Sequence, residues 1–188
     1  SLPKYIFNKG HKSIVKNINP YLTSSDSSYV TRRAKPLNPQ LNRIVYGNLI
    51  NDGGHLVMSH TEKDKLIKQD PDASKFLKLY IGSKEFLRGE QRWCLFIKDF
   101  ELEEAMKIYD ISVRLYRVSE HRKKSTEKST RDIANRPNRF YFQSYNETPS
   151  ILVPRTSSER RDYIPIGFLE KEIIISDAAQ AIYNAEPW

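Results

Sequence analysis

Short apolar runs separated by polar turns dominate the pattern along most of the chain. Runs at 43–46 and 55–58 flank the glycine-containing turn 51–54, so we expect a strand pair or a strand–loop–strand unit there. Residues 92–97 are continuously apolar after Arg92, which is typical of a buried strand. Further β-prone runs lie at 140–142, 151–153, 163–166 and 173–175.

Helical patterns interrupt these runs. Residues 61–69 predict a short polar helix with Thr61 as N-cap, and residues 71–79 predict a second helix with Pro71 at its first position. A longer amphipathic helix follows, because apolar residues recur at spacings of four and three. This stripe consists of Leu102, Met106, Tyr109, Val113 and Tyr116. We expect the stripe to pack on the sheet.

The order of these elements predicts the fold class. Residues 1–42 are rich in Pro, Ser and Asn, so we expect extended segments joined by turns there. Strands, then helices, then strands predict an α+β domain. We expect a mixed or mostly antiparallel sheet, a long amphipathic helix packed on it and a basic helical insert. The length of 188 residues predicts one domain over 1–188.

Charge narrows the class of partner. The net charge is +8, and residues 114–131 alone carry seven Lys or Arg against two Glu. This excess favours an anionic partner, with nucleic acid first and acidic lipid or protein next. The sequence shows no apolar run of membrane length and no signal-peptide pattern, and Cys94 is its single cysteine, so we expect a cytoplasmic chain without membrane partner or disulfides. Because the chain begins at Ser1 and ends at Trp188 without a polar tail, we expect a fragment of a longer protein.

Motifs for catalysis are missing from the sequence. It has neither the Gly-x-Ser-x-Gly of hydrolases nor the phosphate-binding loop of NTPases. The four histidines lack the spacing of a zinc protease, and Cys94 is expected in the core rather than as a nucleophile. We therefore assign no catalytic residue, no metal ligand and no cofactor to these 188 residues.

Three polar stretches are candidates for contact with nucleic acid. The stretch 154–163 joins two predicted strands and contains Arg, Glu and Ser, the residue types that read base edges. A solvated turn with surface ion pairs is the alternative. The stretch 135–139 suits phosphate contact or stacking, with an ordinary surface loop as its alternative. The basic segment 114–131 is either a phosphate-binding surface or a solvated helix face.

Several stretches together resemble one family, across nearly the whole chain. The final motif is the most specific, and the earlier ones are moderately so. They are Asn17-Ile18-Asn19-Pro20-Tyr21-Leu22; Lys35-Pro36-Leu37; Gly47-Asn48; Asp52-Gly53-Gly54; Tyr80-Ile81-Gly82-Ser83-Lys84-Glu85-Phe86; Arg92-Trp93-Cys94-Leu95; and finally Ser157-Ser158-Glu159-Arg160-Arg161 with Tyr163-Ile164-Pro165-Ile166-Gly167-Phe168. Their order resembles the target-recognition domain of large single-chain DNA methyltransferases and restriction–modification enzymes of the MmeI type.

The resemblance implies a function for the chain. In that family, nuclease, helical spacer, adenine-N6 methyltransferase and recognition modules follow one another, and S-adenosylmethionine binds the methyltransferase module. The chain is then a non-catalytic domain that recognises a specific double-stranded DNA sequence and positions the methyltransferase module of the same chain. The parent would be a site-specific adenine methyltransferase of bacterial defence, with endonuclease activity left open. A stand-alone nucleic-acid-processing enzyme and a protein-interaction module remain the alternatives.

The resemblance and the charge together provide candidate residues. The resemblance implies base reading by residues of the final motif, namely Ser157, Ser158, Glu159, Arg161 and Tyr163. Contacts with the DNA backbone are assigned from charge to Arg122, Lys123, Lys124, Arg136 and Arg139. Arg160 is placed with them rather than with the base-reading residues, because a structural role is the alternative for it.

Overall fold

The computed structural model describes residues 2–26, 31–32, 35 and 38–186, and the chain divides after Leu41 into two compact units. Each unit is considered by itself. Pro36 and Leu37 of the resemblance, and the terminal residues Ser1, Pro187 and Trp188, lie outside the described residues.

The first unit contains a β-hairpin of β1 (Lys4–Asn8) and β2 (His11–Val15). Lys9 and Gly10 both have positive φ, the conformation of a two-residue hairpin turn whose twist matches the strands. Beyond the hairpin, the Asn19 side chain accepts hydrogen bonds from the backbone N–H groups of Tyr21 and Thr23, both at 3.0 Å. The extended segments predicted for residues 1–42 are therefore found in the described part, and two of them pair.

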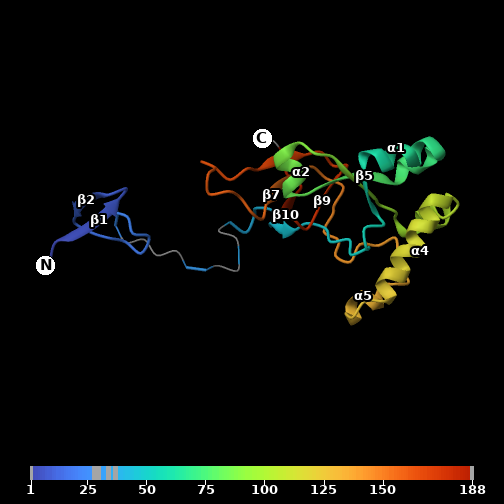
Figure 1. Ribbon diagram of the computed structural model, residues 1–188, viewed down its shortest axis with the longest axis horizontal. Coiled ribbons are helices and arrows are strands. Elements are labelled where there is room, and N and C mark those ends of the chain that lie inside the picture. Colours follow the sequence, from blue (N-terminus) through green and yellow to red (C-terminus); the bar gives the residue numbers. More distant parts are fainter. Residues whose placement is uncertain (1, 27–30, 33–34, 36–37, 187–188) are drawn as a thin grey trace. The chain divides into compact units, whose positions relative to one another are not determined.

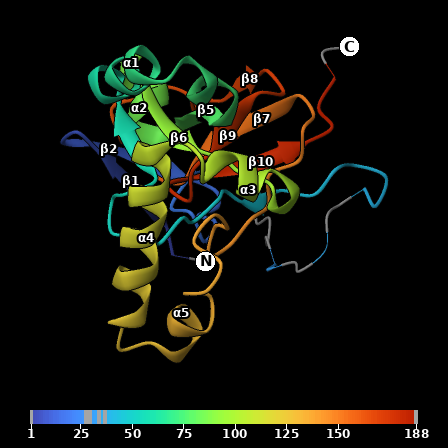
Figure 2. The same ribbon diagram turned by 90° about the vertical axis from the view of Figure 1, so that its right-hand side faces the viewer.

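The second unit is built on two four-stranded sheets (Figures 1 and 2). The first sheet has the order β3 (Val45–Tyr46), β10 (Ala179–Tyr183), β7 (Ser150–Pro154), β8 (Gly167–Leu169), and all its pairs are antiparallel. The second has the order β4 (Val57–Ser59), β6 (Arg92–Leu95), β5 (Leu77–Ile81), β9 (Ile173–Ile175), and only its β5–β9 pair is parallel. The predicted α+β class with mostly antiparallel strands is confirmed.

Helices cover the sheets and extend beyond them. They are α1 (His60–Gln69), the 3-10 turn η1 (Pro71–Phe76), α2 (Ser83–Arg88), the 3-10 turn η2 (Asp99–Glu101), α3 (Leu102–Ala105), α4 (Tyr109–Lys123) and α5 (Lys128–Asp132). Both views place α5 beyond the C-terminal end of α4 (Figures 1 and 2).

The core lies between the sheets and the inner face of α4. It contains the predicted strand at 92–95, where Cys94 is fully buried and Leu95 nearly so. Burial raises the pKa of the Cys94 thiol far above its ordinary value, because the charged thiolate would be desolvated. Cys94 is therefore a core residue, as expected.

Two strand predictions are resolved by the structure. The runs at 43–46 and 55–58 contain the strands β3 and β4 joined by a loop, and they do not pair with each other, since β3 and β4 belong to different sheets. The other prediction was wrong. The run 163–166 forms no strand; it is exposed except for Pro165, and pairing with β7 begins only at Gly167. Proline lacks the N–H that a ladder needs, which is the physical reason that pairing starts after Pro165.

Two helix starts or ends also differ from the predictions. Ser59, rather than Thr61, caps α1, because the Ser59 hydroxyl accepts a hydrogen bond from the Glu62 N–H. The helix predicted over 71–79 is a 3-10 turn that ends at Phe76. The chain then continues as strand β5, in which Leu77 to Leu79 pair with β6. Tertiary pairing in the middle of the sheet overrides the helical pattern there.

The predicted amphipathic stripe is not the buried face. Residues 102–123 form two helices separated at 106–108, and Tyr109 and Tyr116 are 77% and 66% exposed. The buried face of α4 instead consists of Ile111, Leu115, Val118 and Arg122. Tyr109, Val113 and Tyr116 all lie within α4 and share a face, so apolar spacing alone does not decide which face of this helix is buried.

Arg122 lies at the end of this buried face and has no exposed surface. Its Nε donates to the carbonyl of Asn51 at 3.0 Å, and Nη2 donates to the carbonyls of Ile50 at 2.9 Å and Arg139 at 2.8 Å. Nη1 donates to the carbonyls of Arg136 at 3.0 Å and Ile133 at 3.5 Å. All five N–H donors of the guanidinium are thus used inside the protein.

This placement corrects the assignment of Arg122 to the DNA backbone, because a buried, fully bonded guanidinium cannot reach a phosphate. Burial lowers the pKa of Arg122 from its ordinary value, and the nearby Asp52 carboxylate acts in the opposite direction. Arg122 joins the turn at 50–51 to the segment 133–139 and stabilises both.

Replacing Arg122 is expected to destabilise the second unit. Arg122→Met removes five hydrogen bonds to backbone carbonyls, including those of Asn51 and Arg139, and should lower the free energy of unfolding by about 3–5 kcal/mol. Arg122→Lys should recover only part of this, because an ammonium has three donors and no planar fork. Urea unfolding of the 188-residue chain measures both variants. Lys124→Met, two residues further along and exposed, is the matched control, and an equal effect of Lys124→Met and Arg122→Met would show that the carbonyl contacts contribute nothing.

Candidate nucleic-acid interface

The loop 155–166 connects two adjacent strands of the first sheet. β7 and β8 pair in antiparallel register, with Leu152 opposite Gly167, so both ends of the loop are fixed by the sheet. Ser158 organises its tip, since the Ser158 hydroxyl accepts from the Arg160 N–H at 3.2 Å and the Ser158 carbonyl accepts from the Arg161 N–H at 3.1 Å. The loop is therefore a turn held between two strands.

All five residues predicted to read bases lie on this loop and are exposed: Ser157, Ser158, Glu159, Arg161 and Tyr163. Tyr163 is 76% exposed. Within the described parts of the chain, the side chains of Glu159, Arg160 and Arg161 form no hydrogen bond and no ion pair. A guanidinium donor and a carboxylate acceptor two residues apart can therefore both meet an external ligand.

The base of the loop is fixed by close packing and by Arg155. Gly167 approaches the Phe86 ring of α2 so closely that a Cβ at this position would lie 2.5 Å from the ring. Arg155 donates to the carbonyl of Asp177 at 3.0 Å, and its guanidinium lies 5.3 Å from the centre of the Tyr46 ring. These contacts orient the loop before any ligand binds.

The basic segment 114–131 is not a continuous positive surface. Lys123 pairs with Glu120 at 2.8 Å, and Lys128 pairs with Asp132 at 2.7 Å. The Arg131 guanidinium donates to the carbonyls of Ser125 and Thr126. With Arg122 buried as well, much of the local charge excess is paired or enclosed. Lys123 and Lys124 remain exposed at the end of α4.

The stretch 135–139 is also partly used inside the protein. The Arg139 guanidinium forms a two-pronged ion pair with Asp99, and Asn138 is buried and donates to the same carboxylate at 3.0 Å. The hydrogen bond from Arg139 holds the pKa of Asp99 far below its ordinary value. Arg136, in contrast, is exposed.

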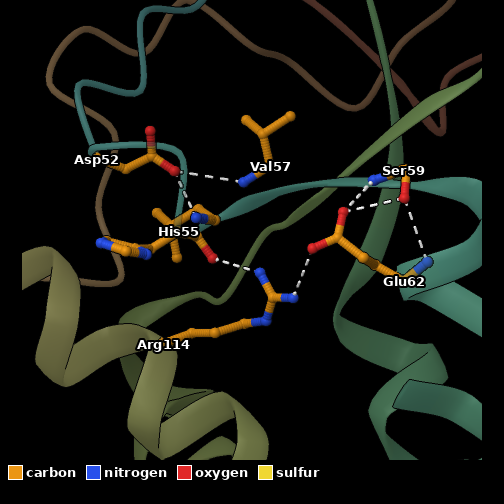
Figure 3. A network of polar contacts seen from close by, with 7 residues as sticks. Asp52, His55, Val57, Ser59, Glu62 and Arg114 are labelled. Atoms are coloured by element: carbon orange, nitrogen blue, oxygen red, sulfur yellow. Dashed lines mark hydrogen bonds and ion pairs between the residues drawn. The ribbon is translucent and has the colours of Figure 1, made fainter. Parts of the chain in front are cut away.

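A polar network fixes α4 against α1 and the turn that precedes β4 (Figure 3). From α4, the Arg114 guanidinium donates to the carbonyl of His55 at 2.9 Å and to Glu62 of α1 at 3.3 Å. Glu62 also accepts from the Ser59 N–H at 2.9 Å, which completes the cap of α1. Asp52 holds the preceding turn by accepting from the Val57 N–H at 3.3 Å. One arginine thus joins three elements, a link that the sequence analysis missed because its partners are about 50 residues away.

The described residues contain no cluster of three or more His, Cys, Asp or Glu side chains arranged to hold a metal ion. Nor does any helix in the described ranges have the length and apolar character needed to cross a membrane.

The fold and the loop define a class of protein: an α+β domain that presents polar side chains on a loop held between two strands. The family model described as "MmeI, target recognition domain" matches residues 24–188. The chain therefore belongs to the family of MmeI target recognition domains.

Two further proteins are similar to the chain, and both are longer than it. It is 37% identical over 183 residues to DNA methyltransferase A of Bacillus subtilis (strain 168), which covers 97% of this chain and 21% of that protein. It is also similar to the Type IIL restriction-modification enzyme MmeI, solved in complex with DNA. Here the TM-score is 0.80 at 33% identity, over 100% of this chain and 26% of that one. The chain thus spans about a quarter or less of the length of these relatives.

The network in Figure 3 predicts a dependence of stability on pH. The Ser59 N–H, and in smaller part Arg114, lower the pKa of Glu62 from its ordinary value. A carboxyl whose pKa is lower in the folded state stabilises the fold above its unfolded pKa, about 4.3, and loses this effect as the pH falls through the folded pKa. Glu62→Gln should therefore be less stable than the unsubstituted chain at pH 7, with a difference that shrinks below about pH 4.

Thermal unfolding between pH 3 and 7 measures this difference. The double variant with Arg114→Gln is the control, because Glu62→Gln should cost less once its partner is removed. A stability difference that is constant with pH would contradict the assignment.

Proposed function

We propose that residues 1–188 act as a single target-recognition domain that binds a specific double-stranded DNA sequence. The observation that carries the proposal is the similarity over the whole chain to MmeI, whose structure was solved in complex with DNA. The exposed loop 155–166 supports it, because its Arg, Glu and Ser side chains have the donors and acceptors that distinguish base pairs in the major groove.

The proposed division of labour follows the geometry. Ser157, Ser158, Glu159, Arg161 and Tyr163 contact base edges, since their side chains are exposed on a loop of fixed orientation. Contacts with phosphates are assigned to exposed cations, namely Lys123, Lys124, Arg136, Arg139 and Arg160. Of these, Arg139 must share its guanidinium with Asp99. Phosphate contacts set position and affinity, whereas base contacts set specificity.

The chain does not catalyse a reaction in this proposal. It positions the methyltransferase module of a longer polypeptide, and that module binds S-adenosylmethionine and methylates adenine at N6. The similarity to DNA methyltransferase A supports such a parent. Because its substrate is bacterial DNA, we place the parent in the cytoplasm, where it serves in defence. Cleavage of DNA by the parent is a separate property that the recognition domain does not determine.

Exchanging donor and acceptor on the loop should change the base that is chosen. In the full-length protein, Glu159→Lys with Arg161→Asp is expected to alter one position of the methylated motif, at a cost of about 1–3 kcal/mol on the original site. Sequencing of methylated bases in a host that expresses the variant gives the motif.

The matched control for this exchange is Lys171→Glu with Glu172→Lys. This exchange swaps a base and an acid outside the loop, whose side chains are 62% and 61% exposed. It should leave the methylated motif unchanged. An active Glu159/Arg161 variant with the original motif would show that the loop does not read bases.

The absence of catalysis has its own test. Residues 1–188 alone are expected to bind no S-adenosylmethionine and to transfer no methyl group, because the sequence has no glycine-rich cofactor loop. Isothermal titration calorimetry with the purified chain measures binding, with the full-length protein as positive control. Saturable binding to the 188-residue chain would contradict the proposal.

A further inference from the structure

A cleft with a cationic lining lies beside the loop 155–166. This cleft of about 770 Å³ separates α2 from the first half of the loop, 155–161. Its cationic lining consists of Lys84 and Arg88 from α2 and Arg155 and Arg161 from the loop. The lining residues in the described part of the chain include hydroxyl groups, such as that of Thr156, and no carboxylate. This combination of cations and hydroxyl donors suits a phosphate group.

The α2 wall of the cleft is rigidly built. Glu85 is buried, accepts from the Gly82 N–H at 2.9 Å and lies 3.3 Å from Nε of Arg92. The Ser83 hydroxyl donates to the carbonyl of Ala178, and Phe86 packs against Gly167 of β8. These contacts fix α2 to β8, the strand that ends the loop.

The cations of α2 are exposed and incompletely neutralised. The side chains of Lys84 and Arg88 are 60% and 65% exposed, and both approach the single carboxylate of Glu90, at 2.9 Å and 3.7 Å. Lys84 lowers the pKa of Glu90, so this carboxylate stays charged. Two cations against one carboxylate leave a net positive charge. Exposed ion pairs of this kind contribute little stabilisation, so a phosphate can displace Glu90 at a small cost in free energy.

We propose that the cleft between α2 and the loop binds a backbone phosphate of the recognised DNA through Lys84, Arg88 and Arg155. The inference rests on the proposed function. It adds α2, a part of the fold with no assigned role, to the interface. Arg155 is already oriented by Asp177 and Tyr46, so little conformational entropy is lost when it meets the phosphate.

The cleft explains how a short loop can read bases in a fixed register. A phosphate held at α2 lies beside Ser157, Ser158 and Arg161, which line the same cleft. The strand is then anchored next to the bases that the loop contacts. Since every nucleotide has the same phosphate, this contact adds affinity for all sequences and does not change the preference among them.

The test uses the full-length protein with Lys84→Gln and Arg88→Gln combined. Binding to the methylated motif and to a scrambled duplex is measured at several salt concentrations. Loss of the contact with this one phosphate should weaken both complexes roughly tenfold and reduce the slope of log K against log salt by about one. The methylated motif should stay the same. Lys68→Gln with Lys107→Gln removes two exposed cations elsewhere and should leave the slope unchanged.

Glu90→Gln provides a test of opposite sign. Removing the competing carboxylate should tighten binding to both duplexes and should not alter the motif. Thermal unfolding of each variant checks that the fold is retained.

Three results would overturn the inference. A slope unchanged by the α2 substitutions would mean that the cleft does not contact DNA. The same unchanged slope is expected if the cleft binds an acidic protein segment instead. A loss confined to the native site, with a changed motif, would mean that α2 reads bases. Binding weakened by Glu90→Gln would contradict the competing role of this carboxylate. If the unsubstituted protein shows no sequence preference at all, the proposed function itself fails.

Discussion

The buried guanidinium of Arg122 is the interaction on which the arrangement of the second unit depends. It donates to carbonyls of the turn 50–51 and of the segment 133–139, which the sequence separates by more than 80 residues. Three of these carbonyls, those of Ile50, Ile133 and Arg136, also accept from a backbone N–H, whereas Arg122 is the donor for the carbonyls of Asn51 and Arg139. Leaving a buried carbonyl without a donor is costly. A charged side chain in the core is tolerated because all five of its donors are used and Asp52 is close.

The loop 155–166 shows the opposite arrangement, with polar groups left for a ligand. Its ends are fixed by the β7–β8 register, by the packing of Phe86 on Gly167 and by Arg155, so the side chains of Glu159, Arg160 and Arg161 are not needed to hold it in place. A rigid scaffold with an exposed polar loop loses little entropy on binding, which favours affinity and a fixed register. Membership of the MmeI target recognition family agrees with this construction.

The distribution of charge is decided by pairing rather than by the number of cations in a stretch. The densest basic stretch, 114–131, loses much of its field because Arg122 is enclosed and Lys123 and Lys128 face carboxylates one turn away. The cleft beside α2 has fewer cations, but they come from two segments, and only the two on α2, Lys84 and Arg88, share a carboxylate, Glu90. The cleft therefore keeps a net positive lining although it has fewer cations than the basic stretch.

The sequence by itself determined the fold class, the buried strand around Cys94 and the family, because apolar runs and specific motifs are local properties. It also placed the candidate base-reading residues on one loop between strands. Only the tertiary structure decided which face of 102–123 is buried, that residues 77–81 pair as a strand, and that Arg122 belongs to the core. These outcomes depend on contacts between distant segments: strand pairing overrides local propensity, and a charge that looks exposed in the sequence finds its partners only when the chain has folded.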